Sequence, residues 1–466
     1  MTVSLTACAT VLDGTPHLAN APTAHLNVIG DSHSWFDNTA KDALADIEAF
    51  WRRNYPKIAG GKPLPPLKGG LYSVNGARVV TTGTAYAPIA REKCIHEKAG
   101  FIVDNAAYCV LDDSIAWDRS PQHLFGRLAA HYGRLMIGLV FAHEFGHAIS
   151  ARLGILKTHP PTIDTESQAD CAAGAWAGSL LRHQDPHFRN ITARDIDDAL
   201  QGFLDGRDKT PGTIGEISHG NGFDRLSALA DGLDHGVTYC YSKTYFNRTF
   251  TERPFSTIQD YRSGGNEPLS QAIAPNSVLP RDLNRFFAGA ARSVHKKFTP
   301  VKLVQTSAPR CGGTSAQLLY CPATNTVQFT SGFARQAYYS LPDVNVDPSN
   351  GNVTLLFHQP ADFALGELFA TTWGFAVRHQ LFARPLDDRN AILSAICYTG
   401  AYAKNVNVPQ NSAGKYLTLS PSDLDEAVSA LLNRSLLIAS FGERGSTGLD
   451  RIQAFVKGYN RGMQAC

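Results

Sequence analysis

Two stretches of this chain, at residues 222–240 and 448–466, align with each other without a gap. The first begins Gly-Phe-Asp-Arg-Leu-Ser-Ala-Leu and the second Gly-Leu-Asp-Arg-Ile-Gln-Ala-Phe, and each continues through two glycines to a cysteine at the same spacing. The segments that follow Cys171 and Cys397 match in a similar way. Because a repeated sequence specifies a repeated structural unit, we expect a tandem duplication that takes up most of the chain.

The first copy carries the pattern His143-Glu144-Phe145-Gly146-His147 within an apolar run that predicts a helix. Histidines four residues apart lie on one face of a helix and can bind the same zinc ion. The glutamate between them then lies beside the metal, where it can take the proton of a water that attacks a peptide carbonyl. We therefore predict His143 and His147 as metal ligands and Glu144 as the general base.

A second predicted helix supplies two carboxylates, Glu166 and Asp170, which share one helix face in a stretch of small apolar residues. A catalytic zinc takes three protein ligands and keeps one position open for water, and Glu166 is the predicted third ligand. Asp170 is predicted to accept a hydrogen bond from the far nitrogen of a ligating histidine and so to fix its tautomer. The alternative, that both carboxylates only solvate the helix, is disfavoured by their apolar surroundings.

Together these motifs resemble those of the neutral zinc metallopeptidases of the YpfJ type, which are gluzincin-like enzymes. Residues 108–118 are similar to a family segment that begins with a Tyr-Cys pair, with Val110 in place of the usual proline. Residues 195–200 and His219-Gly220 are similar to two later elements. The resemblance covers roughly residues 43–240. It implies an α+β fold that is mainly helical and zincin-like, with a small sheet. It also implies an enzyme that hydrolyses peptide bonds in a peptide or protein substrate.

His219 allows two interpretations. A histidine that donates a hydrogen bond near the zinc would stabilise the developing oxyanion, which makes His219 a second catalytic candidate. A single histidine is also often a structural residue whose hydrogen bonds are satisfied by its neighbours. The sequence leaves both possibilities open.

The second copy lacks every group of the predicted zinc site. In the alignment, residues 371–375 read Thr-Thr-Trp-Gly-Phe in place of the metal motif. Glu166 corresponds to Ile392 and Asp170 to Ile396, so apolar side chains replace both carboxylates. We expect a degenerate pseudo-peptidase repeat that serves as a scaffold or binds a protein partner.

Eight of the cysteines fall into two equivalent sets, one in each copy. If both copies use the same connectivity within themselves, three pairings remain, and closeness in sequence favours one of them. The favoured pairs are Cys94 with Cys109, Cys171 with Cys240, Cys311 with Cys321, and Cys397 with Cys466. Such disulfides predict an oxidising, extracytoplasmic compartment, whereas the alternative is a set of free buried thiols.

The remaining cysteine, Cys8, ends the sequence Leu-Thr-Ala-Cys, which resembles a bacterial lipobox whose cysteine is lipidated. Only a fragment of an apolar signal segment precedes it, so we expect either an upstream start or an ordinary cysteine in a tail. The predicted disulfides favour the first alternative. With the overall layout, this start is similar to that of actinobacterial lipoprotein peptidases of the LpqM kind, which implies anchoring to the outer face of the cell membrane.

The composition restricts the partners of the chain. Its 466 residues, 43% of them hydrophobic, suffice for two domains or more. A net charge of +2 provides no strong attraction to nucleic acid or to an anionic membrane surface. No segment reaches the roughly 18 consecutive apolar residues of a membrane span. We therefore expect no nucleic-acid partner and membrane contact only through the lipid anchor.

The predicted organisation is a tail at residues 1–25, a zinc metallopeptidase domain at residues 26–240, a linker at residues 241–278 and the degenerate repeat at residues 279–466. The predicted function is exported, zinc-dependent peptide hydrolysis with one Zn²⁺ per chain. The alternative is a cell-surface scaffold or binding protein whose zinc is structural. An open fourth coordination position distinguishes a catalytic zinc from a structural one, which four protein ligands close.

Overall fold

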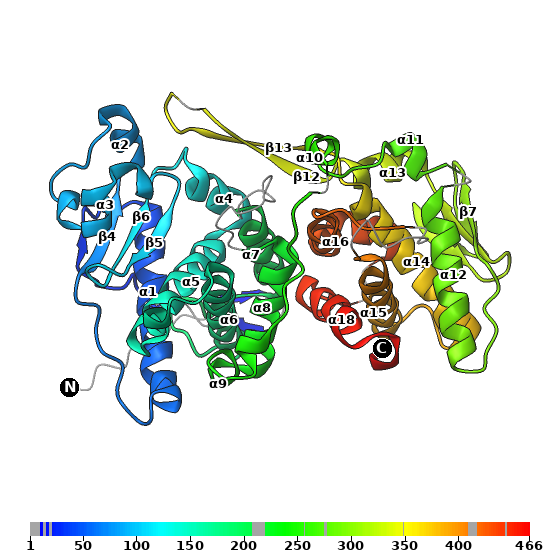
Figure 1. The fold of residues 1–466 in the computed structure, drawn as a ribbon, viewed down its shortest axis with the longest axis horizontal. Helices are drawn as coiled ribbons and strands as arrows, with labels where there is room; N and C mark the ends of the chain where they lie inside the picture. Colours follow the sequence, from blue (N-terminus) through cyan, green and yellow to red (C-terminus); the bar gives the residue numbers. More distant parts are fainter. Residues whose placement is uncertain are drawn as a thin grey trace. The chain divides into compact units, whose positions relative to one another are not determined.

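The computed structural model describes residues 10–12, 15–17, 21–206, 220–255, 257–274, 277–347, 349–408, 417–442 and 445–466. Helices predominate over several small sheets, so the fold is α+β, as the sequence predicts (Figure 1). The chain forms two compact units. Unit 1 comprises Met1–Phe203, Asp231–Arg248 and Val346–Val353, and unit 2 comprises Leu204–Ala230, Thr249–Asn345 and Thr354–Cys466.

These units group some residues differently from the predicted domains. Residues 204–230 of the predicted metallopeptidase domain are grouped with unit 2, and residues 346–353 of the predicted repeat are grouped with unit 1. The predicted linker at residues 241–278 contains the short helices α10 (Ile258–Ser263) and α11 (Leu269–Ala272). The domain boundaries given above therefore stay a prediction.

Unit 1 contains a four-stranded sheet in the order β3-β4-β6-β5. Its strands are β3 (Val28–Ile29), β4 (Gly70–Val74), β5 (Ala106–Cys109) and β6 (Ser114–Asp118). β4 pairs in parallel with β3 and β6, whereas β5 is antiparallel to β6 and forms one edge. This edge strand contacts the helix that carries the metal motif.

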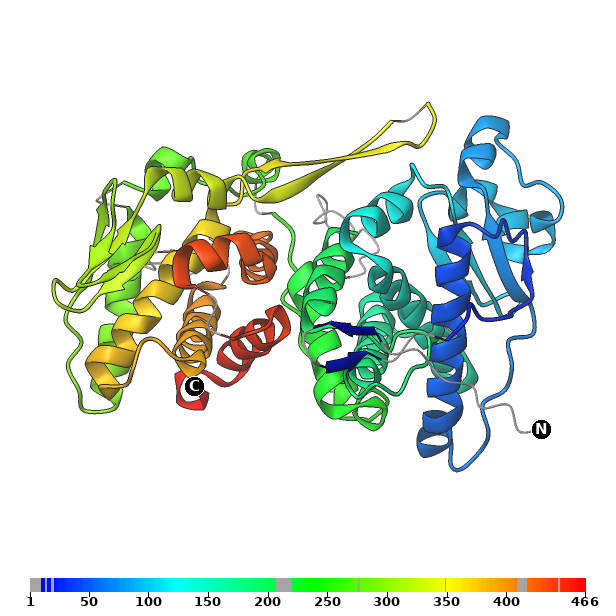
Figure 2. The same ribbon diagram turned by 180° about the vertical axis from the view of Figure 1, so that it is seen from behind.

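Alternate residues of the strands face opposite sides of this sheet. Tyr72, Val74 and Ala116 pack into an apolar cluster with residues from the short helices on one side. On the other side, Asp37 of α1 (Trp35–Ile58) accepts hydrogen bonds from the Ser73 hydroxyl and the Trp117 indole, so α1 runs across that face (Figure 2). The sheet is therefore covered by helices on both faces.

The other helices up to residue 248 are α2 (Gly76–Thr82), α3 (Lys93–Glu97), α4 (Leu124–Tyr132), α5 (Arg134–Arg152), α6 (Thr162–Leu181), α7 (Ala193–Asp205), α8 (Gly222–His235) and α9 (Val237–Cys240). The sequence predicts either one long helix at residues 123–150 or two that break near Gly133. The structure has two, because Gly133 adopts a φ of 85°, a conformation that ends a helix and that glycine tolerates.

Helices α5 and α6 cross at a point that has no room for a side chain. A Cβ atom on Gly146 would lie 2.9 Å from the Cα of Ala169 and 3.1 Å from the Cβ of Ala172. Glycine therefore allows the two backbones to approach each other directly. Gly146 precedes His147 and Ala169 precedes Asp170, so this crossing brings the metal motif next to the predicted carboxylates.

Unit 2 contains a three-stranded sheet, β10-β11-β7, and a helical core. Its strands are β7 (Lys302–Gln305), β8 (Arg310–Cys311), β9 (Thr314–Ser315), β10 (Leu318–Cys321) and β11 (Thr326–Phe329), and a hairpin of β12 (Leu341–Val346) and β13 (Val353–Gln359) follows. Its longer helices are α12 (Val278–Ser293), α13 (Ser331–Tyr338), α14 (Asp362–Phe382), α15 (Arg389–Val406), α16 (Asp423–Leu432), α17 (Arg434–Phe441) and α18 (Gly448–Arg461).

A similar glycine crossing joins α14 and α15 in unit 2. A Cβ atom on Gly374 would lie 2.7 Å from the Cα of Ala395, and in the sequence alignment these two residues correspond to Gly146 and Ala169. The repeated sequence thus coincides with the same helix contact in each unit. The duplication itself stays a prediction.

The structure contains four disulfides with the pairing that closeness in sequence favours. They are Cys94–Cys109, Cys171–Cys240, Cys311–Cys321 and Cys397–Cys466. The second and fourth bridges share a sequence separation of 69 residues and a Cα–Cα distance of 5.6 Å. Bridges of this kind indicate an oxidising, extracytoplasmic compartment. Cys8 lies outside the described residues, and among the described helices none combines the length and apolar character that crossing a membrane requires.

Asp185, in the loop after α6, makes the stability of the protein depend on pH. The side chain is 1% exposed, and burial raises its pKa to about 6 with a further contribution from Asp46, although the Ser179 hydroxyl donates a hydrogen bond to it at 2.5 Å. A carboxyl with a raised pKa contributes stability that is fully present below its unfolded pKa of 3.8 and is lost as the pH rises through 6.

We expect Asp185→Asn, which stays neutral at every pH, to raise the free energy of unfolding by about 1–2 kcal/mol at pH 7.5 and to change it little at pH 4. Urea denaturation at the two pH values measures this difference. An equal effect at both pH values would mean that the carboxyl does not titrate as described.

Candidate metal centre

Three side chains converge where α5 and α6 cross: His143 and His147 from α5, and Glu166 from α6. The Nε2 atoms of the two histidines lie 3.1 Å apart. One Glu166 oxygen lies 3.1 Å from His143 Nε2 and the other 3.4 Å from His147 Nε2. Ligands at about 2.0–2.1 Å from a tetrahedral zinc ion are separated from one another by about 3.3 Å. The three groups therefore have the spacing of a zinc site, and they can hold a metal ion.

Asp170 holds the first histidine in the orientation that a metal needs. The Nδ1 atom of His143 donates a hydrogen bond to Asp170 Oδ1 at 2.7 Å, which leaves Nε2 directed at Glu166 and His147. Burial alone lowers the pKa of His143, but the Asp170 and Glu166 carboxylates raise it to about 10. This negative surrounding favours a cation at the Nε2 side, whether a proton or a metal ion.

Hydrogen bonds fasten α5, α6 and the segment after α9 to one another. The Ser150 hydroxyl donates to Gln168 Oε1 at 2.7 Å, and Gln168 Nε2 donates to the carbonyl of Cys240 at 3.2 Å. The Tyr241 hydroxyl donates to the carbonyl of Gly146 at 3.2 Å. The Cys171–Cys240 bridge begins at the residue after Asp170, so the helix with the third candidate ligand is held covalently as well.

Glu144 lies beside this group and is not part of it. Its side chain is 8% exposed, and its Oε2 atom accepts a hydrogen bond of 2.8 Å from the backbone N–H of Tyr108 on β5. Burial raises the pKa of Glu144, and the His143 and His147 side chains oppose this shift. The structure thus places a carboxylate next to the ligands, with one oxygen held by the edge strand.

The region of unit 2 that corresponds to this site is filled. Thr371, Thr372, Phe375, Ile392 and Ile396 are all buried, in line with the packed core expected from the apolar replacements. The hydroxyl of Thr372 donates to a backbone carbonyl one turn earlier on its own helix at 2.7 Å. None of these five side chains is a metal ligand.

Sequence reasoning missed one acidic residue in that core. Glu367, one helical turn before Thr371, is fully buried, and burial raises its pKa well above the usual range. It accepts a hydrogen bond of 2.9 Å from the Thr371 hydroxyl. Its spacing of four residues from Thr371 places both side chains on one helix face, but a single carboxyl cannot form a set of metal ligands.

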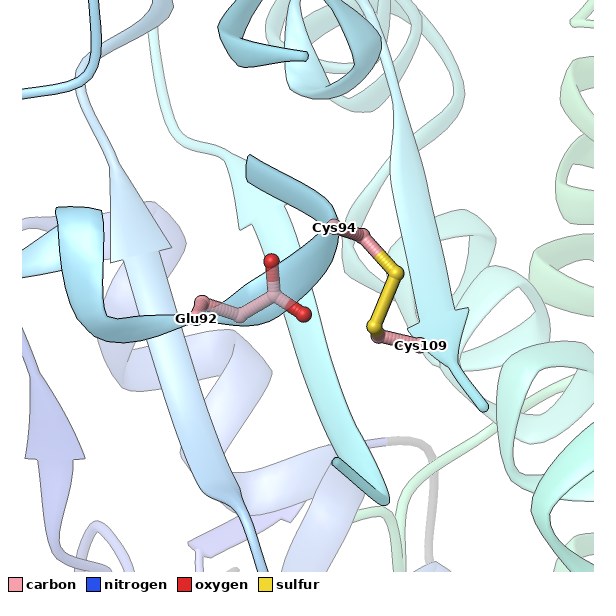
Figure 3. Close-up of side chains that lie close together, drawn as sticks. All are labelled: Glu92, Cys94 and Cys109. Carbon is pink, nitrogen blue, oxygen red and sulfur yellow. A yellow bond between two sulfur atoms is a disulfide. The ribbon is translucent and has the colours of Figure 1, made fainter. Parts of the chain in front are cut away.

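Other groups of potential ligands have different explanations. Cys94 and Cys109 form a disulfide beside Glu92, which removes their thiolates (Figure 3). Glu92 accepts hydrogen bonds from the Ile95 amide and the Ser114 hydroxyl. A second group consists of Asp104, Asp118 and His123, and a third of Asp362, Asp423 and Glu426. In the second group Asp118 pairs with the His123 imidazole at 2.5 Å, and the carboxylates also accept backbone N–H groups. In the third group burial raises the pKa values of all three carboxyls.

His219 lies outside the described residues, so its predicted role is neither supported nor opposed. One group at the site was not identified from the sequence: the backbone N–H of Tyr108, which donates to Glu144. Tyr108 belongs to a motif recognised by its resemblance, yet a backbone N–H leaves no signal in a sequence.

Comparisons with known proteins do not show a family. No protein-family model matches the chain, and no solved structure matches it. Uncharacterized proteins of Mycobacterium bovis and Mycobacterium tuberculosis are 31% identical to the chain over 107 residues, or 20% of its length. The chain spans 36% of the length of these curated relatives. Because the relatives have no described activity, the function is inferred from the candidate metal centre.

Proposed function

We propose that this protein is a zinc-dependent peptidase. The observation that carries the proposal is the convergence of His143, His147 and Glu166 at 3.1–3.4 Å with Glu144 beside them. Three protein ligands leave a fourth tetrahedral position for water, which is the arrangement of catalytic zinc sites. An adjacent carboxylate that does not bind the metal is the second requirement of metal-assisted hydrolysis.

The residues of the chain divide the chemistry among them. A zinc ion held by the two histidines and Glu166 would lower the pKa of water and polarise the peptide carbonyl. Glu144 takes the proton of the attacking water and passes it to the leaving amine. Asp170 keeps the imidazole of His143 in the tautomer that binds metal through Nε2.

The edge strand β5 supports a peptide as the substrate. An extended peptide can pair with an exposed strand edge through backbone hydrogen bonds. β5 forms the edge of its sheet, and its Tyr108 amide already contacts Glu144, so a peptide paired there would lie next to the general base. We therefore propose a peptide or protein substrate. The resemblance to YpfJ-type metallopeptidases supports the same substrate class.

The competing proposal is a scaffold or binding protein with a structural zinc. Structural zinc sites are closed by four protein ligands. Among the described residues, the group that contains Glu166 has three members, and this favours the catalytic proposal. The second half of the chain, whose corresponding region is filled, is proposed as a scaffold or as a site for a protein partner. Attachment to the outer face of the cell membrane through Cys8 also remains a proposal.

The first test is metal content. We expect the purified chain to hold one zinc ion, and Glu166→Gln to weaken zinc binding by at least about tenfold, because the amide removes a charged ligand. Asp164→Asn is the matched control, since Asp164 lies on the same helix outside the ligand group and should keep the parental affinity. Competition with a zinc chelator measures both affinities. Two tightly bound ions per chain would contradict the assignment of a single site.

A further inference from the structure

Arg152, the last residue of α5, is bound to three different parts of unit 1. Its guanidinium donates to the carbonyls of Pro65 and Pro66 at 3.2 Å each, and to the carbonyl of Ala148 at 2.8 Å. It also pairs with the Asp113 carboxylate at 3.0 Å. The side chain is only 7% exposed although it carries a charge. A planar group with five N–H donors suits such a junction, whereas a lysine could not reach every acceptor.

Asp113 connects this junction to the edge strand. It lies in the turn between β5 and β6 with a φ of 62°, and its carboxylate accepts a hydrogen bond of 3.0 Å from the Tyr108 hydroxyl. The same carboxylate accepts the backbone N–H of Lys68 at 3.0 Å. Tyr108 is therefore held through its side chain by Asp113 and Arg152, while its backbone amide holds Glu144.

Helix α5 thus contacts β5 and its turn at two separated points. Glu144 meets the Tyr108 amide, and Arg152, eight residues later, meets Asp113. At 1.5 Å per residue the two contacts are about 12 Å apart along the helix. Helix α5 is also held by α6, and two contacts to the strand at this distance directly constrain the angle between α5 and β5.

From this geometry we infer that Arg152 is a positioning residue for the general base. With Asp113 and Tyr108 it fixes the angle between α5 and β5, and so keeps the Glu144 carboxylate seated on the Tyr108 amide. The inference rests on the proposed peptidase function for its catalytic consequence. The structural part, the seating of Glu144, holds independently of any activity.

Arg152→Gln and Arg134→Gln form a matched pair of variants for the test. Arg134 begins the same helix and pairs with Asp42 at 3.0 Å, so its loss also removes an ion pair of α5, but at the opposite end from β5. In the full, zinc-loaded chain, hydrogen–deuterium exchange at the Tyr108 amide should rise about tenfold in Arg152→Gln and stay unchanged in Arg134→Gln. Glu144→Ala, which removes the acceptor, serves as the positive control for this readout. Equal exchange at Tyr108 in the two arginine variants would overturn the inference.

Hydrolysis of internally quenched peptides tests the catalytic consequence. We expect Arg152→Gln to lower kcat about tenfold with KM within twofold of the parental value and the zinc content unchanged, because misplacing a catalytic group costs rate more than binding. Arg152→Lys should recover part of the loss. A parental kcat in Arg152→Gln would overturn the catalytic part. If the parental chain cleaves none of the peptides while exchange at Tyr108 still rises in Arg152→Gln, the proposed function fails and the positioning role stands.

Discussion

Replacing Glu144 with alanine should abolish peptidase activity and leave the zinc in place. The carboxylate lies beside the ligand group and is held by the Tyr108 amide at 2.8 Å. A general base contributes roughly 10²- to 10⁴-fold to the rate, so we expect kcat to fall by about that factor. The metal should stay bound, because His143, His147 and Glu166 are untouched.

Two further variants separate the base from its surroundings. Glu144→Gln keeps an oxygen that accepts the Tyr108 N–H but cannot take a proton, so it should lose as much activity as alanine. Glu48→Ala removes a partly exposed glutamate of α1 that pairs with Arg52, and it should retain the parental rate. Peptide hydrolysis and zinc content are measured on each purified variant. Cleavage at the parental rate by Glu144→Gln would show that another group serves as the base.

The largest expected effect on stability comes from opening the Cys171–Cys240 bridge. In the chain-entropy model a loop of 69 residues contributes about 4 kcal/mol, and both cysteines are fully buried. Cys171 follows Asp170 directly, and Gln168 bonds to the Cys240 carbonyl. We therefore expect the double variant Cys171→Ala, Cys240→Ala to lose both stability and zinc affinity.

The chain provides its own control for this experiment. Cys397 and Cys466 form a bridge of the same separation and the same Cα–Cα distance in unit 2, where no zinc ligand is predicted. Their replacement by alanine should cost a similar free energy of unfolding, about 4 kcal/mol, without changing zinc affinity. Urea denaturation and chelator competition measure the two quantities. If the Cys397→Ala, Cys466→Ala variant lost as much zinc affinity as the Cys171→Ala, Cys240→Ala variant, this would contradict a local role for the Cys171–Cys240 bridge at the proposed metal site.

The candidate centre could be predicted from the sequence because local geometry determines most of it. Residues four apart on a helix share a face, so the spacing of His143 and His147, and of Glu166 and Asp170, already brings each pair together. The remaining step was the meeting of two helices, which the need for a third protein ligand predicted and the Gly146 crossing explains. The disulfide pairs followed from repetition and closeness in sequence, which left few alternatives.

The sequence could not predict contacts that depend on distant parts of the chain. Glu144 meets the Tyr108 amide 36 residues away, and Arg152 reaches Pro65 across 87 residues. Every residue except proline has a backbone N–H, and a single arginine is part of no spaced motif, so neither leaves a recognisable pattern in the sequence. The grouping of residues 204–230 and 346–353 into the compact units is set in the same way by long-range packing.

The glycine crossing in unit 2 bears on how the proposed zinc site would be loaded. Gly374 and Ala395 touch there although no imidazole or carboxylate pair bridges α14 and α15 at the corresponding positions. A crossing of this kind is thus held by backbone contact, apolar packing and polar contacts such as the hydrogen bond from Arg378 to Ser394 at 2.9 Å, without a metal ion between the helices. We therefore expect α5 and α6 to cross in the same way before a metal ion binds, in contrast to zinc fingers, which are unfolded without their metal. On the proposed zinc function, the chain would fold and form its disulfides first and take up zinc afterwards, so the zinc supply of its compartment, and not its folding, would limit how much of it carries metal.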